Sequence, residues 1–438
     1  MFKRLLRFLQ KDDFSIVPAK PFGISRSNIS KGALFIVEKL QEQGWEAFIV
    51  GGAIRDLLLN KNPKDFDVVT NARPEQIKKV FRKAIVIGRR FRLVHVYHGK
   101  EIIEVSTFRS NTDQSKNFDT TGRILRDNYF GTMIEDVSRR DLTINALYYN
   151  PFADNIFDYH GGIEHLRKKT VKIIGNSRRR LVEDPIRIIR IIRLSSKLSL
   201  VIPNALKREM EKQGHLLKNI PKSRLADDLI KMFLSGNALR CYELLIELNL
   251  YQHILPPIKL PTEDKEKKVL KNRFMSSALN ELDMRLKGDQ VISLTFLFSV
   301  LLWQNISDEV GEFQRKGLNP YVSMKLAIDS IFTKGKDDFW FHKKHMIGIK
   351  ELYLLQVRFD KYAGKSPYTL IRHRRFNAAW RLLRLRVILG EVDIKTVNWW
   401  ENFFHGHDSV RKEMLEKAKA ENKQYRRPKK NSRKLKIR

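Results

Sequence analysis

The sequence has a single cysteine, Cys241, among 438 residues. One cysteine excludes an internal disulfide framework and a zinc site built from cysteines, so a reducing compartment, the cytoplasm, is expected. Long apolar runs are also missing. The longest, at 291–303, is too short to cross a bilayer and is interrupted by hydroxyl side chains, so no stable membrane insertion is expected. The N-terminus lacks the apolar stretch and the small-residue cleavage site of a signal peptide.

Acidic residues are scarce relative to basic ones. The chain has 49 Asp and Glu against 84 Lys and Arg, which gives a formal net charge of +35 at pH 7. Such a field attracts polyanions, and nucleic acid is the commonest polyanion of the cell. The segment 421–438 is nearly all polar and mostly cationic. It predicts a disordered basic tail that neutralises RNA phosphates without reading the RNA sequence.

Secondary-structure patterns change near residue 165. Before it, strand and helix patterns are mixed, which indicates an α/β or α+β catalytic domain. After it, the patterns are helical, so the remainder is expected to be all-α. Residues 1–25 are predicted to be an arm in which Pro18 and Pro21 break any regular element, and 110–125 to be a mobile loop. The predicted strands are 47–50, 66–69, 84–87, 93–97 and 102–107, and the predicted helices include 30–43, 74–82, 181–198, 224–233, 238–250, 291–302 and 375–389.

Two glycines, Gly51 and Gly52, join the first of these strands to a helical pattern. Glycine lets backbone N–H groups approach a phosphate closely, and the helix N-terminus favours the bound anion. Arg55, one turn into the helix, is placed to pair with the same triphosphate. A tight turn without a ligand is the alternative interpretation of these residues.

Two aspartates, Asp65 and Asp67, alternate with apolar residues in the next predicted strand. Residues two apart on a strand project from one face, so both carboxylates are expected on the same side. Like charges that close need a neutralising partner. Mg²⁺ is suited to this role because it prefers carboxylate and phosphate oxygens, with Mn²⁺ as an alternative. Such an ion activates an attacking hydroxyl and stabilises leaving pyrophosphate. The alternative is a solvated strand end.

Four segments together resemble the class II nucleotidyltransferases of the polymerase-β superfamily. The resemblance implies that Asp65 and Asp67 hold the catalytic metal ions and that Asp141 is a further essential acid. Glu104, on the polar face of its predicted strand, is a second and lower-ranked candidate for that acid. The four segments are GGAIRDLLL at 51–59, KDFDVVTNA at 64–72, RRDLTINALYY at 139–149 and EDPIRIIRIIR at 183–193.

The RRD segment adds three candidates for nucleotide binding. The guanidinium groups of Arg139 and Arg140 suit phosphate, because each presents a planar fork of donors. Asn145 is able to hydrogen-bond ribose or phosphate oxygens. The alternative interpretation is a helix N-terminus with charged residues in its first turn.

The EDPIR segment has two interpretations. Asp184 before Pro185 predicts a helix N-cap followed by proline at the first helical position. The family resemblance instead implies that Asp184 and Arg187 act as a protein template for the incoming base. Asp accepts from an exocyclic amine and Arg donates to the neighbouring ring nitrogen, so the pair rejects U and G. It does not separate A from C, because adenine and cytosine present the same donor–acceptor order.

Further segments resemble the bacterial poly(A) polymerase branch more than the CCA-adding branch. The resemblance covers about 20–405 and implies that AMP is added from ATP to RNA 3′ ends, without a template and with release of pyrophosphate. It also implies a role in RNA processing and decay, and partners in the RNA-degradation machinery. The alternatives are a CCA-adding tRNA nucleotidyltransferase and a non-catalytic RNA-binding protein on the same fold. The segments are GRRFRLVHV at 88–96, EIIEVSTFR at 101–109, RHRRFNAAWRLLRLR at 372–386 and WWENF at 399–403.

The same resemblance implies a domain order. A polymerase-β-like palm with a mixed sheet and helices is expected first, followed by all-α neck, body and tail domains. The expected boundaries are an N-terminal arm at 1–25, the nucleotidyltransferase domain at 26–165, a neck for nucleotide recognition and RNA binding at 166–255, a helical body at 256–405 and a basic disordered tail at 406–438.

Overall fold

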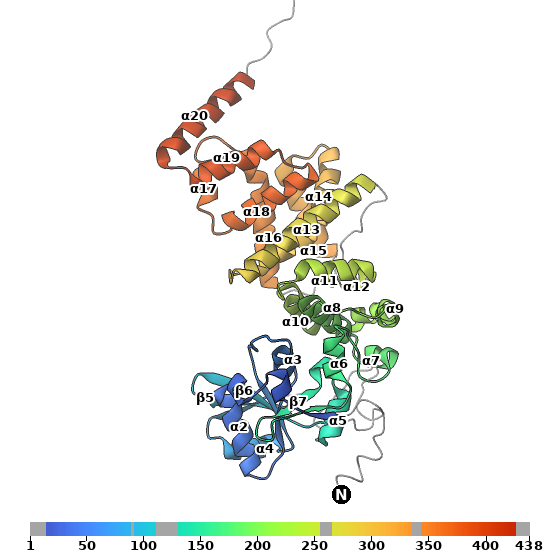
Figure 1. Cartoon of the computed structure of the whole chain (residues 1–438). Coiled ribbons are helices and arrows are strands. Elements are labelled where there is room, and N and C mark those ends of the chain that lie inside the picture. Colours follow the sequence, from blue (N-terminus) through green and yellow to red (C-terminus); the bar gives the residue numbers. More distant parts are fainter. Residues whose placement is uncertain (1–14, 89–91, 111–129, 255–264, 335–342, 426–438) are drawn as a thin grey trace, which may run out of the picture. The chain divides into compact units, whose positions relative to one another are not determined.

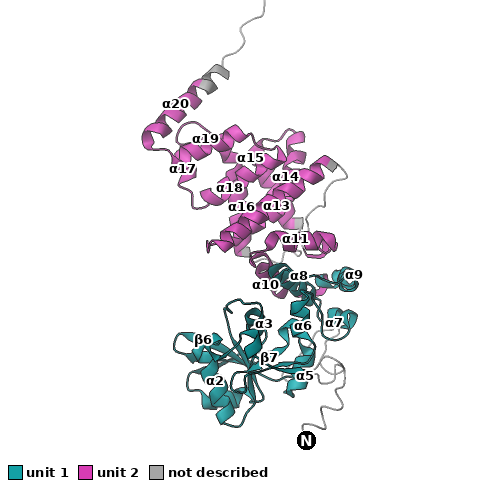
Figure 2. Cartoon of the chain, in the orientation of Figure 1, with its two compact units in different colours: residues 1–217 teal, residues 218–438 magenta. Residues whose placement is uncertain are grey.

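The computed structural model of the chain describes residues 15–88, 92–110, 130–254, 265–334 and 343–425. The chain divides into two compact units, residues 1–217 and 218–438 (Figure 2). The first unit contains the sheet, and the described part of the second contains helices only, which confirms the α+β class and the all-α remainder. The division into five domains stays a prediction. Among the described helices, none combines the length and apolar character needed to span a bilayer.

The first unit is organised around one eight-stranded sheet in the order β1-β8-β7-β2-β3-β6-β5-β4 (Figure 1). All neighbouring strands run antiparallel except β3 and β6, which are parallel. The strands are β1 Ser15–Pro18, β2 Ala47–Val50, β3 Asp67–Thr70, β4 Ala84–Ile87, β5 Leu93–His98, β6 Glu101–Thr107, β7 Leu147–Asn150 and β8 Asn155–Asp158.

The helices of this unit pack on the sheet or follow it. In α2, Ser30 accepts a hydrogen bond from the Ala33 backbone N–H, and the helix buries Ile36, Val37 and Leu40 beside β2, β3 and β6. This capped, amphipathic pattern is the one that predicted a helix at 30–43. The helices are α2 Lys31–Glu42, α3 Gly52–Leu58, α4 Pro74–Val80, α5 Met133–Arg139, α6 Gly162–Arg167, α7 Ser177–Glu183, α8 Ile186–Leu198 and α9 Asn204–Gln213.

The expectation that prolines prevent any regular element in 1–25 is wrong for Ser15–Pro18. These residues form β1, which pairs with β8 at the edge of the sheet. Pro18 is the last residue of this edge strand, a place where the missing N–H of proline costs no inner ladder bond. Residues 1–14 and the predicted loop at 110–125, apart from Ser110, lie outside the described residues.

The single predicted helix at 181–198 is two helices, α7 and α8, separated by Asp184 and Pro185. The break follows from Pro185, which disfavours the helical conformation in the residue before it, and Asp184 has ψ 88°. Asp184 is therefore the C-cap of α7, and the prediction that it caps the N-terminus of the next helix is wrong; Pro185 takes that position without a side-chain cap.

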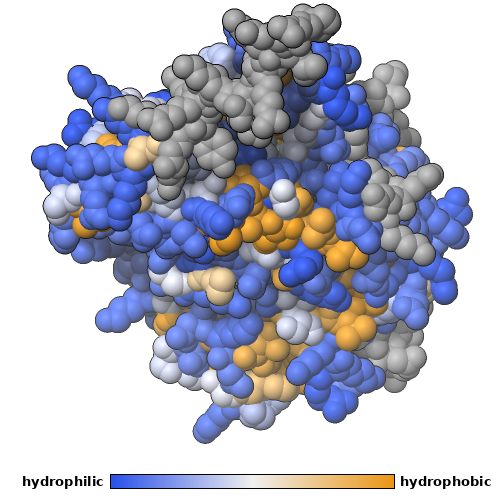
Figure 3. All heavy atoms as spheres, turned by 90° about the horizontal axis from the view of Figure 1, so that it is seen from above, coloured by the Kyte–Doolittle hydropathy of each residue, from blue (hydrophilic) through white to orange (hydrophobic). Residues whose placement is uncertain are grey.

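The second unit is helical throughout its described residues. Its core contains Trp400 and Phe376, and the Trp400 indole donates to the backbone oxygen of Phe359 at 2.8 Å. Figure 3 shows mainly hydrophilic side chains around smaller apolar areas on one face of the molecule, as a chain with 30% charged residues requires. The helices are α10 Lys222–Phe233, α11 Ala238–Glu247, α12 Tyr251–Ile254, α13 Lys265–Lys287, α14 Leu294–Arg315, α15 Pro320–Lys334, α16 Lys343–Gln356, α17 Ser366–Ile371, α18 Phe376–Arg386, α19 Ile394–His405 and α20 Asp408–Tyr425.

Helix α20 corrects the expectation of a disordered tail from residue 406. Its sequence is rich in Glu, Lys and Ala, which favour helices, and Glu413 pairs with Lys417 one turn later at 2.6 Å. Arg411 also ties the helix to α19 by donating to the backbone oxygens of Phe403 and Phe404. The basic segment after residue 425 lies outside the described residues.

Candidate active site

The Gly51-Gly52 turn lies at the end of β2, where the chain enters α3. Gly51 has φ 77° and ψ −129°, a conformation that side chains with a Cβ rarely adopt, so glycine is required here. Its N–H donates to the backbone oxygen of Leu147 on β7 at 3.2 Å. The turn is therefore fixed by the sheet, and the last residue of β2, Val50, is the register partner of Asp67.

Asp67 and Glu104 lie side by side on two inner strands of the sheet, near the Gly51-Gly52 turn. They are Cα partners on the parallel strands β3 and β6. Asp65 lies in the loop two residues before β3. The neighbouring strand β2 ends at Val50, opposite Asp67, so Asp65 has no strand partner there. The strand alternation used to predict a common face therefore does not apply to Asp65.

The electrostatics of Asp67 nevertheless link these carboxylates. Desolvation by surrounding protein atoms, then the charge of Glu104 and the weaker effect of Asp65, raise the pKa of Asp67 to about 6, although Arg140 opposes them. Part of the Asp67 side chain still faces solvent. Crowded, solvent-accessible carboxylates fit a divalent cation, which would relieve their mutual repulsion. No group of three His, Cys, Asp or Glu side chains arranged for a metal occurs in the described part of the chain. The two aspartates would thus need nucleotide or water oxygens to complete a metal site.

The Arg55 guanidinium holds neighbouring side chains in place. It is 6% exposed, and its Nε and Nη2 atoms donate to Asp56 Oδ1 at 2.9 and 2.7 Å. Its Nη1 atom donates to Asn145 Oδ1 at 2.7 Å. Arg55, predicted to bind triphosphate, therefore links α3 to the RRD segment through Asn145.

The carboxylate of Asp141 is contacted by two groups of its own RRD segment and by one residue of α8. Its Oδ1 atom accepts from the backbone N–H of Leu142 at 2.8 Å and from Asn145 Nδ2 at 3.3 Å. Arg190 of α8 approaches its Oδ2 atom to 3.9 Å. A polar chain therefore runs from Arg55 through Asn145 and Asp141 to Arg190.

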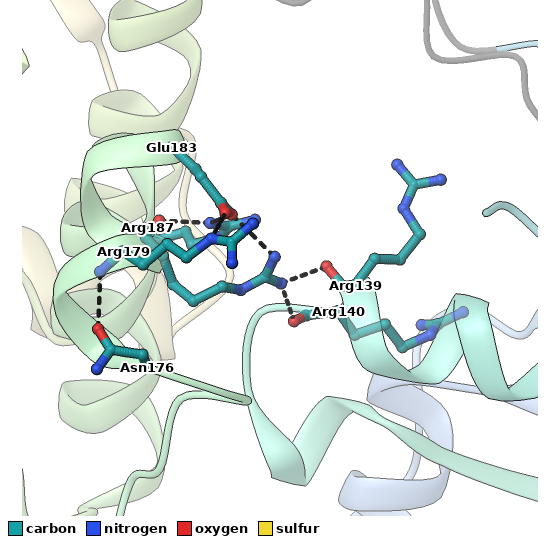
Figure 4. A network of polar contacts seen from close by, with 7 residues as sticks. Arg139, Arg140, Asn176, Arg179, Glu183 and Arg187 are labelled. Atoms are coloured by element: carbon teal, nitrogen blue, oxygen red, sulfur yellow. Dashed lines mark hydrogen bonds and ion pairs between the residues drawn. The ribbon is translucent and has the colours of Figure 1, made fainter. Parts of the chain in front are cut away.

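Arg140 is directed into the fold. Its guanidinium contacts Asp136 at 3.1 Å, donates to the Tyr148 hydroxyl at 2.8 Å and reaches the backbone oxygen of Asn145 at 3.4 Å. Tyr148 in turn donates to Asp136 at 2.5 Å. Arg139 differs, because its side chain extends away from the polar network of α7 and α8 in Figure 4. Of these two arginines, Arg139 is therefore the better placed for a ligand.

Of the two residues predicted to read the base, Asp184 lies in the break between α7 and α8, and Arg187 lies in the first turn of α8. Arg187 donates from Nη1 to the backbone oxygen of Arg180 and contacts Glu183 Oε2 at 3.5 Å. Arg190 follows Arg187 by three residues on the same helix, whose isoleucines face the core. The sequence-based prediction did not include Arg180, Glu183 and Arg190. Glu183 and Arg190 lie four and three residues from Arg187, and Arg180 lies three residues before Glu183, a spacing that was a readable signal.

Comparisons with known proteins identify the family of the chain. The family model "Poly A polymerase head domain" matches residues 47–172, which include the glycine turn, the acids and the RRD segment. The models "Probable RNA and SrmB- binding site of polymerase A" and "Polymerase A arginine-rich C-terminus" match residues 200–260 and 316–434.

Similar proteins cover nearly the whole chain. Poly(A) polymerase I of Haemophilus influenzae is 36% identical over 92% of this chain and 91% of its own. The CCA-adding enzyme of Bacillus cytotoxicus is 32% identical over 76% of this chain and 80% of its own. Among solved structures, a "tRNA-processing enzyme (apo form I)" matches 92% of this chain and 98% of its own with a TM-score of 0.59 at 20% identity, which supports the fold.

The fold and site thus define a nucleotidyltransferase, and the chain belongs to the bacterial poly(A) polymerase family. Its enzymatic activity is that of a poly(A) polymerase, and the CCA-adding enzymes are relatives on the same fold. Enzymes of this family use a divalent metal ion, RNA and a nucleotide. The poly(A) branch predicted from the sequence is confirmed.

Proposed function

We propose that the chain adds AMP units from ATP to RNA 3′ ends, with Asp65, Asp67 and Asp141 as its catalytic acids. The RNA 3′ hydroxyl loses its proton to solvent as its oxygen forms a bond to the α-phosphorus. The bond between the α-phosphorus and the oxygen that bridges to the β-phosphate breaks, and pyrophosphate leaves with that electron pair. The observation that carries the proposal is the register of β2, β3 and β6. It aligns Asp67 with Glu104 and sets both beside the Gly51 turn.

The residues would hold Mg²⁺ through the Asp65 and Asp67 carboxylates, in agreement with the raised pKa of Asp67. When bound, the ion would polarise the α-phosphate and neutralise charge that develops on the leaving group. Glu104 would add negative charge at this position and strengthen metal binding without being required as a direct ligand.

Other residues of the chain would bind and orient the nucleotide. Gly52 would offer its backbone N–H group, and Arg139 a guanidinium, to the triphosphate, while Gly51, whose N–H is bonded to Leu147, would shape the turn. Arg55 and Asn145 would keep Asp141 oriented through their hydrogen bonds. Arg140 would act through its buried contacts with Asp136 and Tyr148, and its positive charge opposes the rise in the pKa of Asp67.

Base selection is assigned to Asp184 and Arg187. Asp184 would accept from N6 of adenine and Arg187 would donate to N1, so uracil and guanine would be rejected. Arg187 would first have to exchange its contacts with Glu183 and the Arg180 backbone oxygen for the base. This exchange makes base recognition a rearrangement rather than a fit to a free side chain.

The experiment that tests this function supplies each nucleotide separately with two RNAs, a tRNA lacking its CCA end and an unrelated RNA. Long A tracts on both RNAs with poor use of CTP support the proposal. The addition of two C residues and one A, confined to the tRNA, would instead assign the CCA-adding activity. Binding of RNA without extension would assign the non-catalytic alternative.

RNA would be bound by distributed cations, which include the basic segment after α20. We further propose that the enzyme acts in the cytoplasm with the RNA-degradation machinery. A protein partner is supported by the family model that matches residues 200–260, whose description names RNA and a second protein as ligands.

A further inference from the structure

Arg180, in the last turn of α7, reaches across to the end of α5. Its Nη2 atom donates to the backbone oxygens of Arg139 and Arg140, each at 2.6 Å. These two carbonyl groups belong to the last residue of α5 and its C-cap, which lack partners within their own helix. A cation is favoured there, because the C-terminal end of a helix carries partial negative charge. The side chain of Arg180 is 12% exposed, so its bonds are shielded from water.

The peptide that Arg180 holds leads directly into Asp141. Arg140 has an extended conformation with ψ 162°, which turns the chain out of α5 immediately before Asp141. The backbone oxygen of Asp141 accepts from Ile174 N–H at 3.2 Å, so the segment leading into α7 also contacts this loop. A shift of Arg180 would therefore displace the backbone that carries the Asp141 side chain.

The same arginine also contacts the residues around the base-reading pair. Arg180 Nη1 donates to Glu183 Oε2 at 3.1 Å, and Arg187 contacts that oxygen at 3.5 Å. Arg187 also donates to the backbone oxygen of Arg180. Arg180 and Arg187 thus share one carboxylate oxygen, and movement of Arg187 toward a base would leave that oxygen to Arg180.

We propose that Arg180 is a positioning residue that couples base recognition at Asp184 and Arg187 to the placement of Asp141. The inference rests on the proposed function of those three residues. A base that draws Arg187 away releases Glu183 to Arg180, which then holds the two carbonyl groups before Asp141 more firmly. When a base does not engage Arg187, Arg187 continues to compete with Arg180 for Glu183. The enzyme would therefore discriminate between nucleotides in the chemical step as well as in binding.

The test compares Arg180→Lys and Arg180→Gln with the matched control Arg179→Gln. Arg179 lies on the same helix and pairs with Glu183 at 3.0 Å, but no contact of its side chain with the carbonyl groups of 139 and 140 is described. We expect Arg180→Gln to lower kcat for ATP by about 10- to 100-fold, since small misplacements of reacting groups cost this much. KM for ATP and RNA affinity should change less than about threefold. Arg180→Lys, which keeps one charged donor, should recover part of kcat, and Arg179→Gln should stay near the wild type.

Two further measurements separate coupling from a general structural role. The ratio of kcat for ATP to kcat for UTP should fall in Arg180→Gln but not in Arg179→Gln. In a double-mutant cycle with Arg187→Ala, the effects on kcat should be non-additive. Additive effects, or equal kcat for Arg180→Gln and Arg179→Gln, would overturn the proposal. A fall in kcat that follows the loss of folded protein in thermal melts, with no recovery in Arg180→Lys, would also overturn it. These comparisons use whichever nucleotide the wild type incorporates. A failure of the ATP assignment is therefore distinguishable from a failure of the proposed coupling.

Discussion

Asp67 and Glu104 occupy directly opposed positions on the only parallel strand pair of the described sheet, and their mutual repulsion is built into the backbone register. This arrangement makes the stability of the fold depend on pH. The pKa of Asp67 is raised above that of an unfolded aspartate, so the folded protein binds more protons between about pH 4 and 6. The contribution of Asp67 to the stability of the metal-free protein should therefore be lost as pH rises through this window.

Glu104→Gln should reduce this loss, because it removes the largest charge effect on Asp67. Thermal melting in EDTA at pH 4.5 and pH 7 measures the difference. Glu38→Gln, at an exposed position of α2, provides a control, and its melting difference should match that of the wild type. An unchanged pH dependence in Glu104→Gln would contradict the assigned cause of the pKa shift.

Asp65→Asn or Asp67→Asn should lower the rate of nucleotide addition by at least about 100-fold, because metal binding needs both carboxylates. RNA affinity should remain close to that of the wild type, since it arises from distributed cations. Single-turnover extension and RNA binding at one salt concentration measure the two effects. Near-normal turnover of Asp67→Asn with Mg²⁺ would disprove the two-carboxylate assignment.

Arg55→Ala should destabilise the protein by about 3 kcal/mol, because it leaves Asp56 without its buried guanidinium partner and removes the bond to Asn145. Arg55→Lys should recover part of this stability but less of the activity, since an ammonium group does not reproduce the planar fork. Urea denaturation and initial rates separate the two losses. Equal recovery of both by lysine would show that only the charge of Arg55 matters.

Deletion of residues 426–438 should weaken RNA binding and flatten its salt dependence. The segment contains eight Lys and Arg residues, and log affinity changes with log salt by about 0.7 for each neutralised phosphate of a single strand. Titrations at several salt concentrations measure the slope. A scrambled segment of the same composition should preserve the slope if charge alone acts. An unchanged slope after deletion would remove this segment from RNA binding.

Much of the sheet was predictable from local patterns, but three of its strands were not. The predicted strands 47–50 and 84–87 match β2 and β4 because compact apolar runs mark them. The strands β1, β7 and β8 were missed. The pairing of these strands depends on partners distant in sequence, such as Ser15 with Asp158. No local periodicity reports such pairing.

At the site, residue types were readable but their contacts were not. Arg55 and Arg140 were both predicted to face phosphate, whereas their guanidinium groups contact Asp56, Asn145, Asp136 and Tyr148. Only the fold brings these groups together. The roles assigned to Asp141, Asp184 and Arg187 stay predictions, because the structure shows their positions but not their ligands.

The parallel pairing of β3 with β6 also has a consequence for how the protein is made. Parallel neighbours need a crossover, and here it includes α4, β4 and β5 between Thr70 and Glu101. The sheet also places β7, at Leu147–Asn150, against β2. During synthesis the ribosome must therefore release about 150 residues before both neighbours of the glycine turn are available. Non-local pairing of this kind forms slowly, so the nascent chain would acquire its catalytic centre later than its helices.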